Sequence, residues 1–244
     1  MSASPILPAN TKNMTSAARA AWLLTAPIVV TSCSAHDEGR PDRHAQQGSA
    51  AAPSPAVYRD TQWVNQAPLI ETYSKAFGGH IVSLTTLAGD TAVKYAPYYF
   101  QHEYLDINKD GNLDIRMHVF SNTPNQCENY FYDSKTRTYH QISSSDLDIK
   151  KLPGTSLYYS NNRLGCASKN WASTLSKIED WQEVQIGYIE INSCGTETEG
   201  ITIYKIKDGK QQLVSTLKIQ ELSRSKGVLH FFDNYWKRHY KQFE

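Results

Sequence analysis

The stretch that decides the fold reads FQHEYLDINKDGNLDIRMHVF and covers residues 100–120. Aromatic, apolar or His side chains take every second position on both sides of its central loop, namely Phe100, His102 and Tyr104 before it, and Ile115, Met117 and Val119 after it. A period of two places alternate side chains on opposite faces of a strand. The stretch therefore predicts two β-strands joined by a loop, and it favours a mainly β chain.

The loop inside this stretch carries side-chain oxygens at alternate positions. They belong to Asp106, Asn108, Asp110, Asn112 and Asp114. Counted from Asp106, these residues hold positions 1, 3, 5, 7 and 9, and Gly111 holds position 6. This is the spacing of a calcium-binding loop, in which the glycine permits the tight turn and position 7 offers its backbone carbonyl. The sequence therefore predicts Ca²⁺ as a cofactor.

Two features separate this loop from an EF-hand. Position 12 is Met117, where an EF-hand has a bidentate Glu, and the flanks are strands. A metal-free turn held by Asx hydrogen bonds is the alternative. Three carboxylates this close repel one another without a cation, which favours calcium in a structural role, fixing the register of the two strands.

Turn residues divide the rest of the chain into further short elements. Strands are expected at His80–Leu84, Tyr130–Tyr132, Val184–Ile191, Ile201–Ile206 and Gln211–Ile219. Asp208-Gly209 between the last two strands is a hairpin signal. Only Trp171–Ile178 and the C-terminal Val228–Phe243 favour helix. Because most connections are too short for helical crossovers, the expected class is mainly β, a twisted antiparallel sheet with a C-terminal helix.

Composition narrows the function classes. The 244 residues carry a net charge of +1, which argues against a nucleic-acid partner. No apolar run approaches the roughly 20 residues that span a bilayer. The sequence has no H-E-x-x-H, G-x-S-x-G or P-loop motif, so we do not expect an enzyme. His102 and His118 flank the acidic loop and could face each other across a hairpin, although packing is the favoured role.

The first 33 residues have the pattern of a lipoprotein signal peptide. Arg19 precedes the short apolar stretch Ala20–Val30, which is too short to span a membrane. Val30-Thr31-Ser32-Cys33 resembles the lipobox of bacterial lipoproteins, in which the Cys is lipidated and begins the mature chain. Ser34 after it favours the outer membrane, on the periplasmic side. An ordinary cleaved signal with a chance Cys is the alternative, and Met14 is a second candidate start.

A flexible tether and three further cysteines follow. Residues 34–56 are small, polar and proline-containing, and so predict a tether that precedes a folded domain over 57–244. In an oxidising envelope, one disulfide is expected among Cys127, Cys166 and Cys194. Cys166–Cys194 is favoured because each residue lies beside a Gly in a candidate loop, and three reduced thiols are the alternative.

Several of these features together resemble a known family. The lipobox and the loop Tyr104–Arg116 are followed by the aromatic turn Glu128–Tyr139 and by the closing hairpin Tyr204–Val214. This pattern is similar to periplasmic lipoproteins that act as immunity proteins of the bacteria-killing type IV secretion system. It covers roughly residues 80–219. The resemblance implies a lysozyme-inhibitor-like or propeller-like β fold, and a lysozyme-like peptidoglycan hydrolase effector as the partner.

The resemblance also implies a site. Lysozyme inhibitors push a loop into the hydrolase cleft, and the corresponding loop here is Ser121–Tyr130. Its candidate partner-binding residues are Ser121, Asn122, Thr123, Asn125, Gln126 and Tyr130. Lysozyme inhibitors often carry a Ser-Gly-…-Tyr pattern, whereas this chain has Asn in place of Gly and a longer spacing. Tyr130 fits an interface anchor and a structural position in the sheet equally well.

Two other function classes remain open from the sequence. One is a calcium-stabilised binding or adhesion lipoprotein of the bacterial envelope. The other is an enzyme such as a glycan hydrolase, because Asp and Glu are plentiful and a carboxylate pair leaves no sequence mark. A neighbouring gene for a secreted peptidoglycan hydrolase favours the inhibitor.

Overall fold

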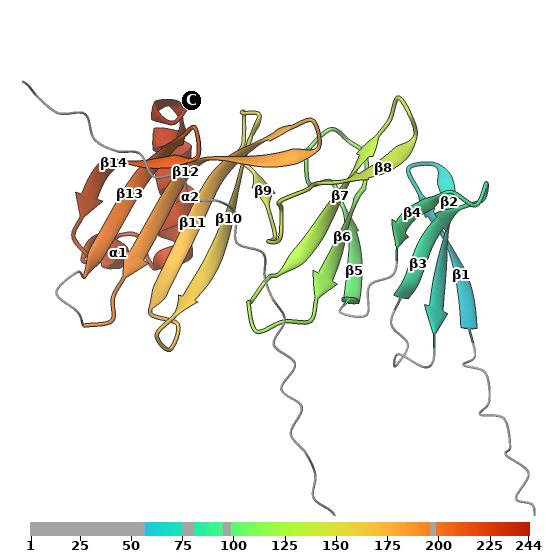
Figure 1. Cartoon of the computed structure of the whole chain (residues 1–244), viewed down its shortest axis with the longest axis horizontal. Coiled ribbons are helices and arrows are strands. Elements are labelled where there is room, and N and C mark those ends of the chain that lie inside the picture. The colour runs from blue at the N-terminus through green and yellow to red at the C-terminus, as the bar shows by residue number, and fades with distance from the viewer. Residues whose placement is uncertain (1–56, 75–80, 95–98, 196–198) are drawn as a thin grey trace, which may run out of the picture. The chain divides into compact units, whose positions relative to one another are not determined.

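The computed structural model describes residues 57–74, 81–94, 99–195 and 199–244, and for Ile81 and Val82 it describes the backbone alone. The predicted signal peptide, the predicted lipidation site Cys33 and the predicted tether lie outside these residues. Within them, no helix is long and apolar enough to cross a membrane. The described strands form three sheets in which every pair of neighbouring strands is antiparallel (Figure 1).

The first two sheets are four-stranded, and their strands lie in chain order. The first consists of β1 (Val57–Val64), β2 (Ala67–Ser74), β3 (Ile81–Thr86) and β4 (Thr91–Lys94). The second consists of β5 (Tyr99–Leu105), β6 (Asp114–Val119), β7 (Cys127–Asp133) and β8 (Thr138–Gln141). The stretch quoted first is therefore the β5–β6 hairpin, as predicted.

The third sheet has six strands in the order β14-β13-β12-β11-β10-β9. They are β9 (Lys150–Lys151), β10 (Leu157–Gly165), β11 (Asn170–Glu179), β12 (Gln182–Asn192), β13 (Gly200–Lys207) and β14 (Lys210–Leu217). A helical C-terminal part follows, with α1 (Glu221–Arg224), α2 (Val228–His239) and the 3₁₀ turn η2 (Tyr240–Gln242). The mainly β, antiparallel class with a C-terminal helix is confirmed.

One predicted helix is wrong. Residues 171–178 belong to β11, which pairs along its length with β10 on one side and with β12 on the other. The apolar residues Trp171, Leu175 and Ile178 have the i, i+4, i+7 spacing of a helix face, so the local pattern favours a helix that the structure does not form. Backbone pairing on both edges overrides such a local signal.

The core of the third sheet depends on the C-terminal helix. Phe231, Phe232 and Trp236 of α2 are buried against the sheet, and Phe243 beyond it is only 2% exposed. The Nε1–H of Trp236 donates to the Ser173 hydroxyl on β11 at 2.7 Å. These rings come so close to the sheet that only glycine fits beneath them.

The position beneath them is Gly187 on β12. A Cβ atom there would lie 2.8 Å from Cδ1 of Phe243 and 3.2 Å from Cη2 of Trp236. Any larger residue would force the Phe243 ring to shift and would disturb its packing on the sheet.

A second core cluster joins side chains of the first and second sheets. Its buried members include Leu69 and Leu84 from the first sheet, and Ile115 and Met117 from β6. The carboxylate of Glu71, which is 2% exposed, lies beside it. This carboxylate accepts from His102 Nε2 at 3.0 Å, from the Tyr104 hydroxyl at 2.7 Å and from the Tyr73 hydroxyl. A buried carboxylate is tolerated there because several donors surround it.

Cys166 and Cys194 are joined by a disulfide, which is the pairing favoured by the sequence. It links the β10–β11 turn to the segment after β12. Cys127 is fully buried on β7 and has a free thiol. Burial raises the pKa of this thiol to about 12, so it stays protonated at neutral pH and acts as a small apolar residue.

Candidate functional site

The acidic loop between β5 and β6 directs most of its side-chain oxygens at its own N–H groups. The Asp106 carboxylate accepts from the backbone N–H of Asp110 at 3.1 Å and of Gly111 at 3.2 Å. Asp110 accepts from the backbone N–H of Asn112 at 2.8 Å and from the Asn108 side-chain amide at 3.0 Å. These bonds form the Asx turn that the sequence left open as the alternative.

Asp114 is the member of the predicted ligand set that lies deepest. It is fully buried, and its carboxylate accepts from the backbone N–H of Ile107 at 2.8 Å, of Asn108 at 3.2 Å and of Tyr132 at 2.9 Å. Burial raises its pKa to about 6, although the three N–H donors favour the charged form. Asp114 therefore ties the loop to β7 through backbone contacts.

A lysine supplies positive charge next to the loop. The Nζ of Lys151 on β9 donates to the backbone carbonyl of Asn108 at 2.5 Å. It also lies 5.9 Å from the centre of the Tyr158 ring. The carboxylates of the acidic loop therefore have a cation of the chain itself close by, which weakens the argument that only a metal ion can balance their repulsion.

The oxygen ligands of the loop still suit a hard cation such as Ca²⁺, except for those of Asp114. Asp106, Asn108 and Asp110 carry oxygens near the surface, whereas both oxygens of Asp114 face backbone N–H groups. Among the residues that the structure describes, no group of three or more His, Cys, Asp or Glu side chains is arranged to hold a metal ion.

The second candidate region is the β6–β7 loop, residues 120–126. Its base is closed by the backbone N–H of Val119, which donates to the Gln126 carbonyl at 2.9 Å. The segment before β9 supports it further, since the Asp148 N–H donates to the Asn125 carbonyl at 3.2 Å. Within the loop, the Ser121 hydroxyl accepts from the Thr123 N–H at 2.9 Å. The loop is therefore held at both its base and its tip.

Five of the six predicted partner-binding residues lie in this loop and fall into three groups. Asn122 and Asn125 are exposed on the loop surface. Ser121 and Thr123 form the internal turn just described, and Gln126 is half-buried where the loop joins β7.

Tyr130 lies in the core. It is 6% exposed, and its hydroxyl donates to Glu128 at 2.9 Å. These contacts fit the structural role of Tyr130 in the sheet. With 6% of its surface exposed, Tyr130 offers little area to a partner.

Two exposed aromatic residues beside the loop were missed by sequence reasoning. Phe120 is 81% exposed and Phe100 is 43% exposed, and their rings meet edge to face with centroids 6.1 Å apart. Both line a pocket of about 310 Å³ together with Pro124 and Asn125. We call Phe100, Phe120 and the loop 121–126 the aromatic loop surface. A β-bulge at Phe100 interrupts the β5–β6 register and upsets the simple alternation in which this residue shares a face with His102 and Tyr104.

The two histidines that flank the acidic loop do not form a pair. His102 contacts Glu71 at 3.0 Å, whereas His118 contacts Glu103 at 3.1 Å. They occupy adjacent register positions across the hairpin, His102 opposite Met117, so they point to opposite faces of the sheet. The idea of a metal-binding or catalytic His pair fails here for a geometric reason.

Comparison with solved structures gives a distant likeness. No protein-family model matches the chain, and no curated protein matches it. One solved structure, described as a Xanthomonas type IV secretion system related protein, is similar over 66% of this chain and 85% of that chain, with 16% sequence identity and a TM-score of 0.38. At this level of similarity the likeness carries no argument about function.

Proposed function

We propose that this protein is an envelope-anchored immunity protein that binds and inhibits a lysozyme-like peptidoglycan hydrolase effector of a type IV secretion system. The observation that carries the proposal is the aromatic loop surface: a braced polar loop with Phe120, 81% exposed, at its edge. Large exposed aromatic residues are costly in water and are typical anchors of protein interfaces. The choice of partner comes from the sequence resemblance.

The chemistry of the loop suits a cleft lined by carboxylates. Lysozyme-like enzymes act through two carboxyl groups on either side of the scissile bond. Residues 120–126 carry no charged side chain, so the loop can enter such a cleft without like-charge repulsion. The side-chain amides of Asn122 and Asn125 would donate hydrogen bonds to the carboxylates, and Phe120 would pack on the rim of the cleft. In this proposal the protein occupies the cleft and cleaves nothing itself.

The bracing of the loop supports tight binding. The closing Val119–Gln126 bond and the Ser121–Thr123 turn restrict the loop before any partner arrives. A loop ordered in advance loses less conformational entropy on binding, so more of the contact energy becomes affinity.

Two further parts of the proposal concern location and metal. We propose that Cys33 is lipidated and that residues 34–56 tether the domain to the outer membrane on its periplasmic side, where injected hydrolases act. We also propose that the acidic loop binds calcium through Asp106, Asn108, Asp110 and the carbonyl of Asn112. In that arrangement Asp114 would bind the backbone of the loop through its hydrogen bonds, and the ion would neutralise the charges of Asp106 and Asp110.

The test is inhibition of the peptidoglycan hydrolase encoded beside this gene. The purified protein should inhibit it and should release no product from peptidoglycan alone. Scrambling residues 122–126 should raise the inhibition constant more than tenfold, which corresponds to about 1.4 kcal/mol. The scrambled order should keep Asn at position 125, where φ is 62°, and a melting curve should show that the variant is folded.

The matched control is Leu87→Ala, which removes a 68% exposed apolar side chain in the β3–β4 turn. It should inhibit as the parent does. If the scrambled loop also inhibits as the parent does, the contact surface lies elsewhere. If the parent inhibits no such hydrolase but retains envelope glycan in a pulldown, the binding-lipoprotein alternative replaces this proposal.

A further inference from the structure

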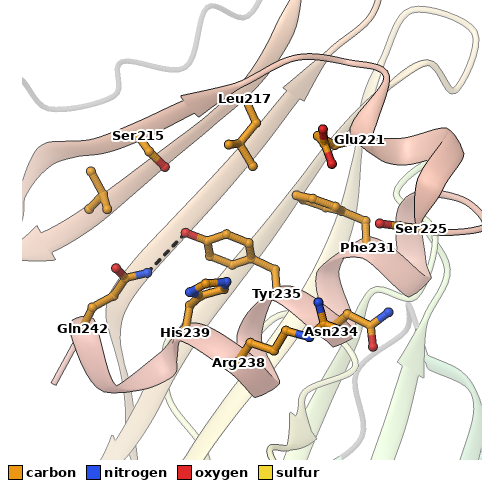
Figure 2. A pocket seen from close by; sticks show the side chains of 11 residues that line it. Ser215, Leu217, Glu221, Ser225, Phe231, Asn234, Tyr235, Arg238, His239 and Gln242 are labelled. Atoms are coloured by element: carbon orange, nitrogen blue, oxygen red, sulfur yellow. Dashed lines mark hydrogen bonds between the residues drawn. The ribbon is translucent and has the colours of Figure 1, made fainter.

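A second surface with binding features lies at the other end of the described chain, between the edge strand β14 and the helix α2. A groove of about 440 Å³ opens there, with Ser215 and Leu217 of β14 on one wall. Tyr235, Arg238 and His239 of α2 form the opposite wall. Figure 2 shows the Tyr235 ring extending from the helix toward the strand, with Gln242 Nε2 donating to its hydroxyl.

The strand on this groove has an open edge. β14 pairs with β13 on one side and is the outermost strand of its sheet among the residues that the structure describes. In an edge strand, half of the backbone N–H and C=O groups point away from the sheet and can pair with an added strand. Leu213, 63% exposed, and Val214, 39% exposed, add apolar surface along the same strand.

The charge of the groove is positive. Arg238 and His239 are exposed on its helix wall, and neither forms a salt bridge within the described residues. The one carboxylate that lines the groove, Glu221, is already paired, with Arg224 Nη1 2.6 Å from its Oε1. A segment that lies along β14 would therefore meet an unpaired guanidinium on the helix.

We propose that β14 and this groove form a docking site for an extended, acidic segment of a partner protein, which adds as a strand beside Ser215–Leu217. Backbone pairing would supply the register, and a carboxylate of the segment would form a bidentate ion pair with Arg238. The site is separate from the aromatic loop surface and does not depend on the proposed inhibition. A second copy of this chain is a poorer occupant, because the one carboxylate that its own groove offers, Glu221, is already paired with Arg224.

A β-bulge in β14 limits which segments can pair with this edge. The β13–β14 register shifts between Ile203 and Tyr204, which leaves Val214 as an extra residue in β14. Such a bulge twists an edge and limits continuous pairing to a short segment. A partner strand must therefore match the three residues beside the groove, and uncontrolled edge-to-edge association is suppressed.

The test uses the full chain and a synthetic eight-residue peptide of alternating Glu and Val, with a peptide of alternating Lys and Val as its control. At low salt the acidic peptide should bind, with a dissociation constant below about 1 mM. It should also slow amide hydrogen exchange within Ser215–Leu217. The Lys peptide should bind at least tenfold more weakly. Binding of the acidic peptide should weaken as salt is added.

Two variants make the test specific. Arg238→Glu, on the groove wall, should weaken binding of the acidic peptide at least tenfold. Lys237→Glu makes the same charge change one residue away on α2, outside the groove lining, and should weaken it less than twofold.

If both variants bind the acidic peptide equally weakly, the proposed site is wrong, because the effect would then come from the overall charge of the protein. Equal binding of both peptides, or no binding at about 1 mM, would overturn the acidic partner. A concentration-dependent dimer with protected β14 amides would assign the edge to a second copy instead.

Discussion

The two loops at the ends of β6 use similar residues in opposite ways. The acidic loop before β6 turns its carboxylates toward its own N–H groups, and Asp114 at its end is fully buried. The β6–β7 loop instead leaves Asn122, Asn125 and Phe120 facing solvent. Polar groups that are satisfied inside a loop contribute to stability, whereas exposed groups remain available for a partner. We therefore expect mutations in the first loop to affect stability and mutations in the second to affect binding.

The largest expected effect is the loss of stability in Asp114→Ala. The change leaves three backbone N–H groups without their acceptor, and each buried unsatisfied donor costs about 1–3 kcal/mol. We expect a loss of at least about 3 kcal/mol in the free energy of unfolding, measured by urea denaturation. At about 2–4 °C per kcal/mol, the melting temperature should fall by roughly 6–12 °C. Asp114→Asn keeps one acceptor oxygen and should lose less. A loss under about 1 kcal/mol for Ala would show that the carboxylate is not holding the loop.

A smaller effect, confined to binding, is expected for Phe120→Ala. The side chain is 81% exposed, so unfolding should change by no more than about 0.5 kcal/mol. The inhibition constant for the cognate hydrolase should rise at least tenfold, or about 1.4 kcal/mol. Calorimetry and inhibition assays on the same preparation separate the two effects. A variant that melts early and inhibits normally would reverse the contrast between the loops.

Calcium should raise the melting temperature of the parent by a few degrees. An ion at ten times its dissociation constant stabilises the folded state by about 1.4 kcal/mol through mass action. Thermal melts in calcium and in chelator would measure this shift. Asp110→Ala should abolish it, and Asp90→Ala, which removes an exposed carboxylate from another turn, should preserve it. If the parent melts identically in both buffers, calcium does not stabilise the loop, and the Asx turn and Lys151 hold it without a metal ion.

The smallest effect is expected at a buried carboxylate that has hydroxyl donors rather than a set of backbone donors. Glu183 is 8% exposed and accepts from the Ser176 hydroxyl at 2.8 Å, and burial raises its pKa above the ordinary 4.5. The folded state therefore holds a proton at pH values where the unfolded state has lost it. Its contribution to stability is greatest below the ordinary pKa and declines as pH rises through the folded pKa.

Glu183→Gln removes this titration and keeps the shape. Relative to the parent, the variant should be more stable at pH 8 than at pH 5, which means that the variant-minus-parent difference in the free energy of unfolding should become more positive as pH rises. Denaturant titrations across this range measure the difference. A constant difference at all pH values would mean that Glu183 has the same pKa in both states.

The sequence predicted the elements whose signals are local. Alternation located β5 and β6, and Asp208-Gly209 located the β13–β14 turn, where both residues have positive φ. The loop with Asn122 and Asn125 was singled out through the family resemblance; both side chains are exposed, and their role in binding stays a prediction.

Features that depend on non-local pairing were missed. β11 was taken for a helix because its apolar spacing fits both structures, and only its two neighbouring strands decide between them. The bulge that sets the position of Phe100 depends on how β5 pairs with β6, and the N–H donor that Tyr132 gives to Asp114 comes from β7. No single stretch of sequence carries these signals.

The packing of Phe243 over Gly187 has a consequence for the order of synthesis. The third sheet cannot bury its apolar face until the chain has been extended to Phe243, whether it is emerging from a ribosome or being threaded through a translocon. At roughly 5–20 residues per second, the stretch of about 100 residues after β8 takes on the order of 5–20 s to make. During that interval the strands from β10 onward expose apolar surface that can aggregate. A chaperone that covers this surface would act at this stage of biogenesis.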